Sequence, residues 1–169
     1  MFTNELRNQA VEILDGCRKK GLKLTAAESC TGGLISALLT EIPGASDAFE
    51  RGFVTYSNKS KSDMLGVDAA LIRDHGAVSD EVATAMAEAA LDEARADVAV
   101  AVTGIAGPSG GTAEKPVGLV YVAVMTRKNL MVSKNNFSGD RNSIRLQSVA
   151  KALTMLQDSI NHSSFSRVA

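Results

Sequence analysis

Two short apolar runs constrain the fold of this chain more than any other feature. Residues Val98–Val102 and Leu119–Met125 are almost continuously apolar, as is typical of strands that are covered on both faces of a sheet. A sheet covered on both faces needs one layer of helices above it and another below it. The sequence therefore predicts an α/β fold, a three-layer α/β/α sandwich with a mixed, mostly parallel sheet.

Amphipathic segments alternate with the strands along the chain. Apolar residues recur at helical spacing from Thr3 to Lys20, and Gly21 ends that helix. The same patterns predict helices over 31–40, 68–75, 79–95 and 140–161, and strands over 22–27, 52–56 and 130–137. The link between the strand over 119–125 and the last one is too short for a parallel crossover, so these two strands should be antiparallel. The last strand is more polar and should lie nearer an edge.

The length of the chain and the absence of linkers indicate one domain. A chain of 169 residues suits a single sizeable core, and we find no internal repeat or low-complexity stretch. We therefore expect one domain over 1–169, with a loose tail over 162–169.

Composition argues against several classes of function. The net charge is −1 and aromatic residues make up 4%, whereas nucleic-acid binders normally show a basic excess or stacking aromatics. Two cysteines and two histidines at scattered positions form neither a disulfide framework nor a metal-ligand pattern. The chain begins without the apolar core of a signal peptide, and no apolar run approaches the ~20 residues that span a bilayer. We expect a cytoplasmic protein without a metal or a membrane span, and composition argues against nucleic acid as a partner.

Four predicted strand ends carry polar or glycine-rich residues. Open α/β sheets bind ligands at the carboxyl ends of their strands, so these four segments are the candidate site. They are Glu28–Gly33, Tyr56–Lys61, Thr103–Gly111 and Phe137–Arg141.

The first segment has the form of a nucleophile elbow, with a strand, Ser29, two glycines and a helix. Such a turn exposes the serine oxygen and directs backbone N–H groups at a developing oxyanion. A serine before a helix also suits an N-cap, and the full G-x-S-x-G motif is absent. Cys30 is a rival nucleophile because a thiol at a helix N-terminus ionises readily, although cysteine beside a strand is more often a small buried hydrophobe.

A serine nucleophile needs a base, and lysine suits that role better than histidine in this chain. His75 ends a predicted helix and His162 begins the predicted tail, which gives a Ser-His-Asp triad poor support. Lys59 and Lys61 both follow Tyr56 at a strand end. A catalytic lysine must be partly neutral near pH 7, which requires desolvation or nearby positive charge. Spacing does not choose between these lysines, and most lysines are solvated surface residues.

Arg141 and Arg145 suggest an anion site at the start of the last helix. They lie four residues apart and hence on one face, where the helix dipole disfavours cations by up to ~1 kcal/mol each. A bound phosphate or carboxylate would offset that cost, and pairing with Asp140 is the alternative. The glycine-rich loop from Gly104 to Gly111 could enclose a ligand or serve only as a flexible connection.

These segments together resemble the CinA C-terminal domain family, whose stand-alone members are nicotinamide-nucleotide amidohydrolases. The resemblance covers nearly the whole chain, and larger family members carry an additional N-terminal domain, so this chain resembles the stand-alone form. The matching stretches are TAAESCTGG, RGFVTYSNKSK, HGAVS, TGIAGPSGG, KPVGLVYVA and FSGDR.

The resemblance implies an activity and assigns residues to it. The family's reaction is hydrolysis of the carboxamide of nicotinamide mononucleotide to nicotinate mononucleotide and ammonia, in pyridine-nucleotide salvage, without metal or organic cofactor. The family pattern makes Ser29 the nucleophile and selects Lys61 as its base, and it suggests a homodimer. The resemblance also suggests Tyr56 as a further catalytic position, with the role of a proton relay. The substrate-binding positions are Cys30, Thr31, Gly32, Gly33, Thr103, Gly104, Gly107, Arg141 and Arg145, with Arg145 as the main phosphate ligand.

Three other interpretations remain open from the sequence. The glycine loops and arginines also suit a non-catalytic nucleotide-binding module. The family's historical name suggests a competence or recombination accessory that binds DNA or a repair protein, although the charge and aromatic content count against direct contact with DNA. A cysteine hydrolase based on Cys30 is the third.

Overall fold

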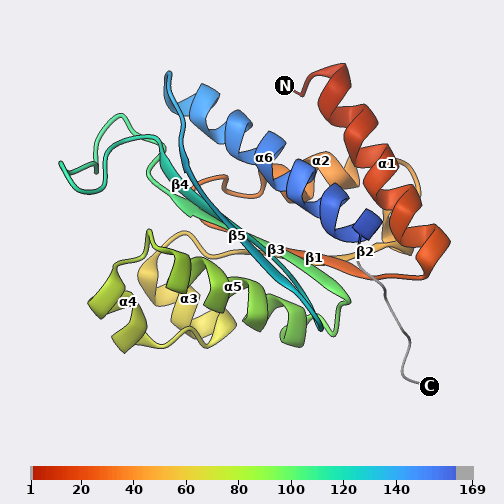
Figure 1. Ribbon diagram of the computed structural model, residues 1–169, viewed down its shortest axis with the longest axis horizontal. Helices are drawn as coiled ribbons and strands as arrows, with labels where there is room; N and C mark the ends of the chain where they lie inside the picture. The colour runs from red at the N-terminus through yellow and green to blue at the C-terminus, as the bar shows by residue number, and fades with distance from the viewer. Residues whose placement is uncertain (1, 163–169) are drawn as a thin grey trace.

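A five-stranded sheet forms the middle layer of the protein in a computed structural model that describes residues 2–162 (Figure 1). The strand order across the sheet is β2-β1-β3-β4-β5. The strands are β1 (Leu24–Glu28), β2 (Phe49–Val54), β3 (Val98–Gly104), β4 (Leu119–Thr126) and β5 (Leu130–Asn136).

The direction of the strands brings most of their carboxyl ends to one edge. Strand β1 pairs in parallel with both β2 and β3, while β4 is antiparallel to both β3 and β5. Four strands therefore point the same way, and only β4 points the other way. The mixed, mostly parallel sheet, the antiparallel β4–β5 pair and the edge position of β5 are all confirmed.

Helices cover both faces of the sheet. Helices α1 (Asn4–Lys20), α2 (Leu34–Thr40) and α6 (Arg141–His162) lie on one face, and α3 (Asn58–Leu65), α4 (Ala69–His75) and α5 (Asp80–Glu93) lie on the other (Figure 1). A short 3₁₀ turn, Ala45–Asp47, precedes β2. The three layers predicted from the apolar strands are confirmed.

Local capping explains most of the helix boundaries. The side chains of Asp68 and Ser79 cap α4 and α5, and Gly21 ends α1 in the left-handed region at φ 63°. Helix α2 begins at Leu34, three residues later than predicted, because the preceding segment is a turn in which Gly32 and Gly33 have φ values of 59° and 93°. The prediction for that helix start was wrong because the pattern of apolar residues does not reveal positive φ angles.

The start of β2 and the end of α6 also differ from the prediction. Strand β2 begins at Phe49 rather than Gly52, because its polar start lies at the edge of the sheet and lacks an apolar pattern. His162 closes α6 instead of starting a tail, and the remainder of the predicted tail, 163–169, lies outside the described residues.

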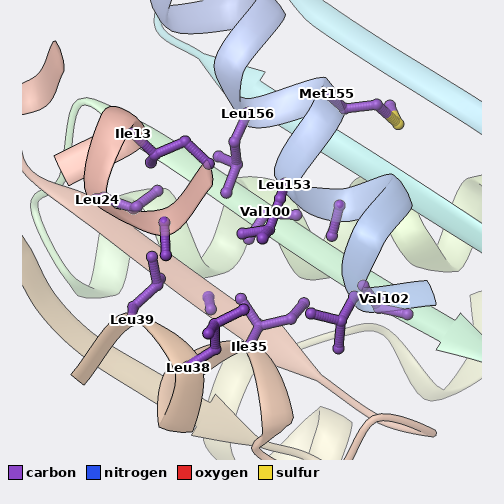
Figure 2. Packing of buried hydrophobic residues seen from close by; sticks show 14 of the residues in the cluster. Ile13, Leu24, Ile35, Leu38, Leu39, Val100, Val102, Leu153, Met155 and Leu156 are labelled. Atoms are coloured by element: carbon purple, nitrogen blue, oxygen red, sulfur yellow. The ribbon is translucent and has the colours of Figure 1, made fainter. Parts of the chain in front are cut away.

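The larger hydrophobic core lies between the sheet and helices α1, α2 and α6. Figure 2 shows Ile13, Ile35 and Leu156 from these helices packing over Leu24 and Val100 of the sheet. Each fully buried Leu or Ile side chain contributes roughly 1.5–3 kcal/mol to the free energy of unfolding. The same core includes Cys30 directly after Ser29, Leu34 at the start of α2 and Ile144 near the start of α6, so it holds these three segments together.

The opposite core is rich in alanine. Ala83, Ala87 and Ala90 of α5 face Ala99 and Ala101 of β3, and all five are fully buried. Small side chains on both elements allow the helix to pack closely against the sheet. No helix among residues 2–162 is long and apolar enough to cross a membrane.

Candidate active site

A pocket of about 230 Å³ lies at the edge of the sheet where the carboxyl ends of β1, β2, β3 and β5 meet. Its walls are Ser29 and Cys30 after β1, Tyr56 after β2, residues of the loop 104–110 after β3, and Arg141 at the start of α6. All four strand ends singled out from the sequence therefore contribute to one cavity. The shared direction of four strands is what brings these distant segments together.

Ser29 and Lys61 form a buried pair at this pocket. The Nζ of Lys61 lies 3.0 Å from the Oγ of Ser29 and donates a hydrogen bond of 3.0 Å to the carbonyl oxygen of Thr55. The two residues are only 8% and 1% exposed. Ser29 follows β1 directly, and Lys61 lies one turn into α3, whose start is held by a capping box between Ser57 and Ser60.

The geometry distinguishes the two lysines that spacing left equivalent. The side chain of Lys59 is 82% exposed and forms an ion pair with Asp63 on the surface of α3. Lys61 lies two residues further along the helix and therefore points towards the sheet. The serine's partner is thus Lys61, and Lys59 is the solvated neighbour.

Burial favours the neutral form of Lys61. Desolvation lowers the pKa of Lys61 below its ordinary value of 10.5, and among residues 2–162 no carboxylate forms an ion pair with its Nζ. A thiolate at Cys30 would oppose this shift. Burial, however, raises the pKa of the Cys30 thiol to about 11, so this cysteine is a neutral thiol near pH 7. The pair therefore has the electrostatics of a lysine base beside a serine, and Cys30 lacks those of a nucleophile.

Glu28 has a structural role that reasoning from the sequence missed. Its side chain is fully buried, and its carboxylate accepts hydrogen bonds from the N–H groups of Gly33, Ile35 and Ser36 at 3.1, 3.0 and 2.8 Å and from the Oγ of Ser36 at 2.7 Å. These are the free donors at the start of α2, where a negative charge is favourable. An acidic residue at the end of an apolar strand was the available signal. Because Glu28 caps the helix, the interpretation of Ser29 as its N-cap is wrong.

The backbone N–H groups after Ser29 fall into two classes. Gly32 donates to the carbonyl of Ser29 at 3.0 Å, and Gly33 donates to Glu28. The N–H groups of these two predicted binding residues are therefore already used within the protein. Cys30 and Thr31 differ, because neither N–H group donates a hydrogen bond to another described residue. Cys30 directly follows the serine, where a nucleophile elbow places an oxyanion donor.

The two arginines of α6 have different surroundings. Arg141 donates to the Oη of Tyr56 at 2.6 Å and to the carbonyl of Gly107 at 2.7 Å, so it joins two loops at the pocket. Arg145 does not line this pocket. Its Nε and an Nη donate to the carbonyls of Cys30 and Thr31 at 3.2 and 2.7 Å.

The alternative in which these arginines pair with Asp140 is not what the structure shows. Asp140 accepts a hydrogen bond of 2.7 Å from the N–H of Ser143, and no ion pair within 2–162 links it to Arg141 or Arg145. The hydrogen bonds from Ser143 lower the pKa of the Asp140 carboxyl. Asp140 thus helps to start α6 and leaves both guanidinium groups to the loops.

Thr103, Gly104 and Gly107 support the loop after β3. The hydroxyl of Thr103 donates to the carbonyl of Ala77 at 2.7 Å, and Thr103 does not line the pocket. A Cβ on Gly104 would lie 2.6 Å from Val120, and one on Gly107, which has φ +76°, would lie 2.6 Å from Val117. Glycine is required at both positions for close packing of the loop, which explains the motif without a phosphate cradle.

The remaining titratable residues form no second centre in the described part of the chain. His75 pairs with Glu81 at 2.8 Å on the surface. Residues 2–162 contain no cluster of three or more His, Cys, Asp or Glu side chains that could hold a metal ion.

Comparison with known proteins identifies the family. The family model of the CinA C-terminal domain matches residues 6–160. Nicotinamide-nucleotide amidohydrolase PncC of Escherichia coli is 46% identical over 157 residues, which cover 92% of this chain and 95% of that protein. A CinA-like protein of Syntrophobacter fumaroxidans is 56% identical over 139 residues, 82% of this chain but 32% of the relative, so the chain spans about a third of that protein's length. The crystal structure of the competence/damage inducible protein CihA from Agrobacterium tumefaciens superposes with a TM-score of 0.93 at 47% identity, covering 96% of this chain and 99% of that one. This chain belongs to the CinA C-terminal domain family.

Proposed function

We propose that this protein hydrolyses the carboxamide of nicotinamide mononucleotide to nicotinate mononucleotide and ammonia, through an acyl-enzyme on Ser29. The observation that carries the proposal is the buried Ser29–Lys61 pair, with 3.0 Å between Oγ and Nζ, at a pocket of the sheet edge. The substrate comes from the name of the E. coli relative, which matches this chain over nearly its whole length.

In the first half of the reaction, neutral Lys61 accepts the hydroxyl proton of Ser29. The serine oxygen then attacks the carboxamide carbon, whose electrophilicity the positive pyridinium ring increases. One N–H of the Lys61 amine remains bonded to the carbonyl of Thr55, which holds the nitrogen within 3.0 Å of the serine oxygen; the proton transfer uses the lone pair of the neutral amine. Lys61 next returns its proton to the amide nitrogen, the C–N bond breaks, and ammonia leaves.

The oxyanion of the tetrahedral intermediate needs hydrogen-bond donors that the resting protein does not use. The N–H groups of Cys30 and Thr31 meet this requirement, because no acceptor among the described residues occupies them. Loss of one such donor typically costs about 3–4 kcal/mol of transition-state stabilisation. We therefore assign the oxyanion site to these two residues and not to Gly32 or Gly33, whose N–H groups are engaged elsewhere.

Hydrolysis of the acyl-enzyme repeats the same proton transfers with water. Lys61 takes a proton from a water molecule, the resulting hydroxide attacks the ester carbon, and the proton passes to the Ser29 oxygen as the ester bond breaks. Nicotinate mononucleotide leaves with Ser29 and neutral Lys61 restored. The chemistry uses only side chains and backbone groups of this chain and water.

We assign the phosphate of the substrate to Arg141 instead of Arg145. Arg141 lines the pocket, and its contact with Tyr56 can be exchanged for a phosphate oxygen at the surface. The guanidinium of Arg145 is committed to two backbone carbonyls. Tyr56 is 59% exposed and bonds to Arg141, which supports a place at the rim of the pocket more than a proton relay. The cytoplasmic location and the homodimer stay predictions.

Release of ammonia from nicotinamide mononucleotide tests the proposal. Wild type should turn over, whereas Ser29→Ala and Lys61→Ala should each lose at least about 10⁴-fold in kcat, because nucleophile and base act as one unit. Lys59→Ala is the matched control, since it removes an exposed lysine two residues away, and its kcat should equal that of wild type.

Other outcomes would support the other interpretations. Binding of the nucleotide by wild type without any ammonia release would contradict the proposal and support a non-catalytic binding module. Unimpaired turnover by Ser29→Ala together with loss of turnover in Cys30→Ala would transfer the chemistry to the cysteine.

A further inference from the structure

Arg145 touches the loop that carries the nucleophile without touching the pocket itself. It lies in the second turn of α6 and is half-buried. Its guanidinium donates to two consecutive carbonyls, those of Cys30 and Thr31, at 3.2 and 2.7 Å. A cation at the start of a helix is unfavourable by up to ~1 kcal/mol, and these two carbonyl oxygens offset that cost without a bound anion.

Each of these carbonyls belongs to a peptide unit whose N–H group points in the opposite direction. The carbonyl of Cys30 shares its peptide unit with the N–H of Thr31, so Arg145 acts on that donor directly. The carbonyl of Thr31 shares its peptide unit with the N–H of Gly32, which donates to the carbonyl of Ser29 at 3.0 Å. That last carbonyl shares its peptide unit with the N–H of Cys30. Two hydrogen-bonded routes therefore connect the guanidinium to the two unoccupied donors.

We propose that Arg145 is a positioning residue that orients and polarises the N–H groups of Cys30 and Thr31 for the oxyanion. This inference rests on the proposed function. A cation bound to a carbonyl draws electron density through the planar peptide unit and makes its N–H a stronger donor. Hydrogen bonds in series strengthen one another by about 10–30% per bond. Arg145 thereby acts on the transition state through the backbone and makes no contact with the substrate.

Two further features of the loop agree with this role. Gly32 has φ +59°, a conformation that other residues rarely adopt, and it lies against the guanidinium, since a Cβ there would be in ordinary contact with an Nη of Arg145 at 3.5 Å. Glu28 on the other side takes the N–H groups of Gly33, Ile35 and Ser36. Glu28 thus binds the N–H groups at the start of α2, and Arg145 binds the carbonyls of Cys30 and Thr31. The N–H groups of Cys30 and Thr31 are left for the substrate.

The test compares Arg145→Lys and Arg145→Met with wild type in steady-state ammonia release. A lysine retains the charge but cannot bind two carbonyls in the fork geometry of arginine. We expect kcat to fall about 10–100-fold in both variants, while KM changes less than about twofold. This fall does not exceed the one that removal of a whole oxyanion donor causes, which is about 10²–10³-fold. The same factor should appear with nicotinamide riboside, which lacks the phosphate. Arg73→Met, at an exposed arginine paired with Asp74, is the matched control and should leave kcat unchanged.

Arg141→Met provides the contrast. It should raise KM for nicotinamide mononucleotide much more than KM for nicotinamide riboside, because only the nucleotide loses a phosphate ligand, whereas loss of the hydrogen bonds to Tyr56 and Gly107 affects both substrates equally.

A substrate analogue with an aldehyde in place of the carboxamide gives a second measurement. The Ser29 O–H adds across the aldehyde C=O to form a hemiacetal, and no atom is lost. The former aldehyde oxygen then occupies the position of the oxyanion. Affinity for this analogue should fall in Arg145→Lys by the same factor as kcat. In a Ser29→Ala background, where no adduct forms, Arg145→Lys should leave the affinity for the analogue unchanged.

Three results would overturn the inference. A raised KM with unchanged kcat, for the nucleotide but not for the riboside, would make Arg145 a phosphate ligand. Weaker binding of the analogue in the Ser29→Ala background as well would indicate general collapse of the loop. Absence of ammonia release by wild type would overturn the proposed function itself, and with it this inference, before any Arg145 variant is measured.

Discussion

Substitution of Glu28 tests how the turn between Ser29 and the start of α2 is held in place. We predict that Glu28→Gln destabilises the protein, although glutamine has almost the same shape. One carboxylate oxygen accepts from the N–H groups of Gly33 and Ile35, and the other accepts from the N–H and the hydroxyl of Ser36. Glutamine offers only one acceptor oxygen and places an NH₂ group at the second position.

The size of the effect follows from these contacts. If the glutamine oxygen faces Gly33 and Ile35, the Ser36 hydroxyl can rotate and accept from the NH₂ group, but the Ser36 N–H cannot. A donor left without an acceptor costs about 1–3 kcal/mol, and the remaining bonds lose the strength that the charge supplied. We expect a total loss of about 2–3 kcal/mol from a free energy of unfolding that is typically 5–15 kcal/mol. For a chain of this size that corresponds to a fall in Tm of about 4–12 °C.

Thermal and urea unfolding followed by circular dichroism measure this loss. Glu88→Gln is the matched control, because Glu88 is exposed in the middle of α5 and should change stability by less than about 0.5 kcal/mol. If Glu28→Gln unfolds within about 0.5 kcal/mol of wild type, the carboxylate does not hold the start of α2, and the argument from its four hydrogen bonds fails.

Three further predictions concern the pocket. First, kcat/KM should rise with pH as Lys61 loses its proton. The midpoint of this rise should lie below the ordinary lysine pKa of 10.5, because burial lowers the pKa of Lys61. A midpoint at 10.5 in the pH–rate profile would contradict a buried base. For the same reason the unfolded chain binds more protons than the folded one between the two pKa values, so stability should rise with pH across that window, and urea unfolding of Lys61→Met should lack this rise. Second, Cys30→Ala should retain turnover, and iodoacetamide should inactivate wild type slowly at pH 7, because the pKa of Cys30 is about 11; rapid inactivation prevented by Cys30→Ala would refute this. Third, Gly107→Ala should raise KM several-fold, since its Cβ would lie 2.6 Å from Val117. Gly44→Ala, with φ +75° and only the flexible side-chain ends of Arg18 and Asp47 nearby, should affect stability alone; equal KM values in the two variants would show that the loop accommodates the methyl group.

Most of the architecture was predictable because it depends on local patterns. The apolar runs over 98–102 and 119–125 require cover on both faces, and caps such as Thr3, Asp68 and Ser79 mark helix starts through hydrogen bonds to residues two or three positions away. The prediction failed at Leu34 and Phe49, where a pair of left-handed glycines and a polar edge strand interrupt these patterns.

The candidate site was predictable only in part. The sequence marked four strand ends, and its resemblance to a family selected Lys61 over Lys59. The roles of Arg145 and Glu28 could not be predicted from the sequence, because their partners are backbone carbonyls and N–H groups, which nearly every residue possesses. A pattern of residue types carries no information about which backbone groups are left free.

By itself, then, the sequence determined the layers, the order of the elements and the set of segments that can carry chemistry, since periodicity and capping act over a few residues. The tertiary structure places Lys61 against Ser29, as the family resemblance had implied. It alone decided that Arg145 binds the carbonyls of Cys30 and Thr31, that Arg141 joins two loops at the pocket, and that Cys30 is a buried, neutral thiol. Each of these depends on burial and on distances between residues 32 to 115 positions apart. Only the direction of the strands, set when the whole sheet assembles, brings such residues together.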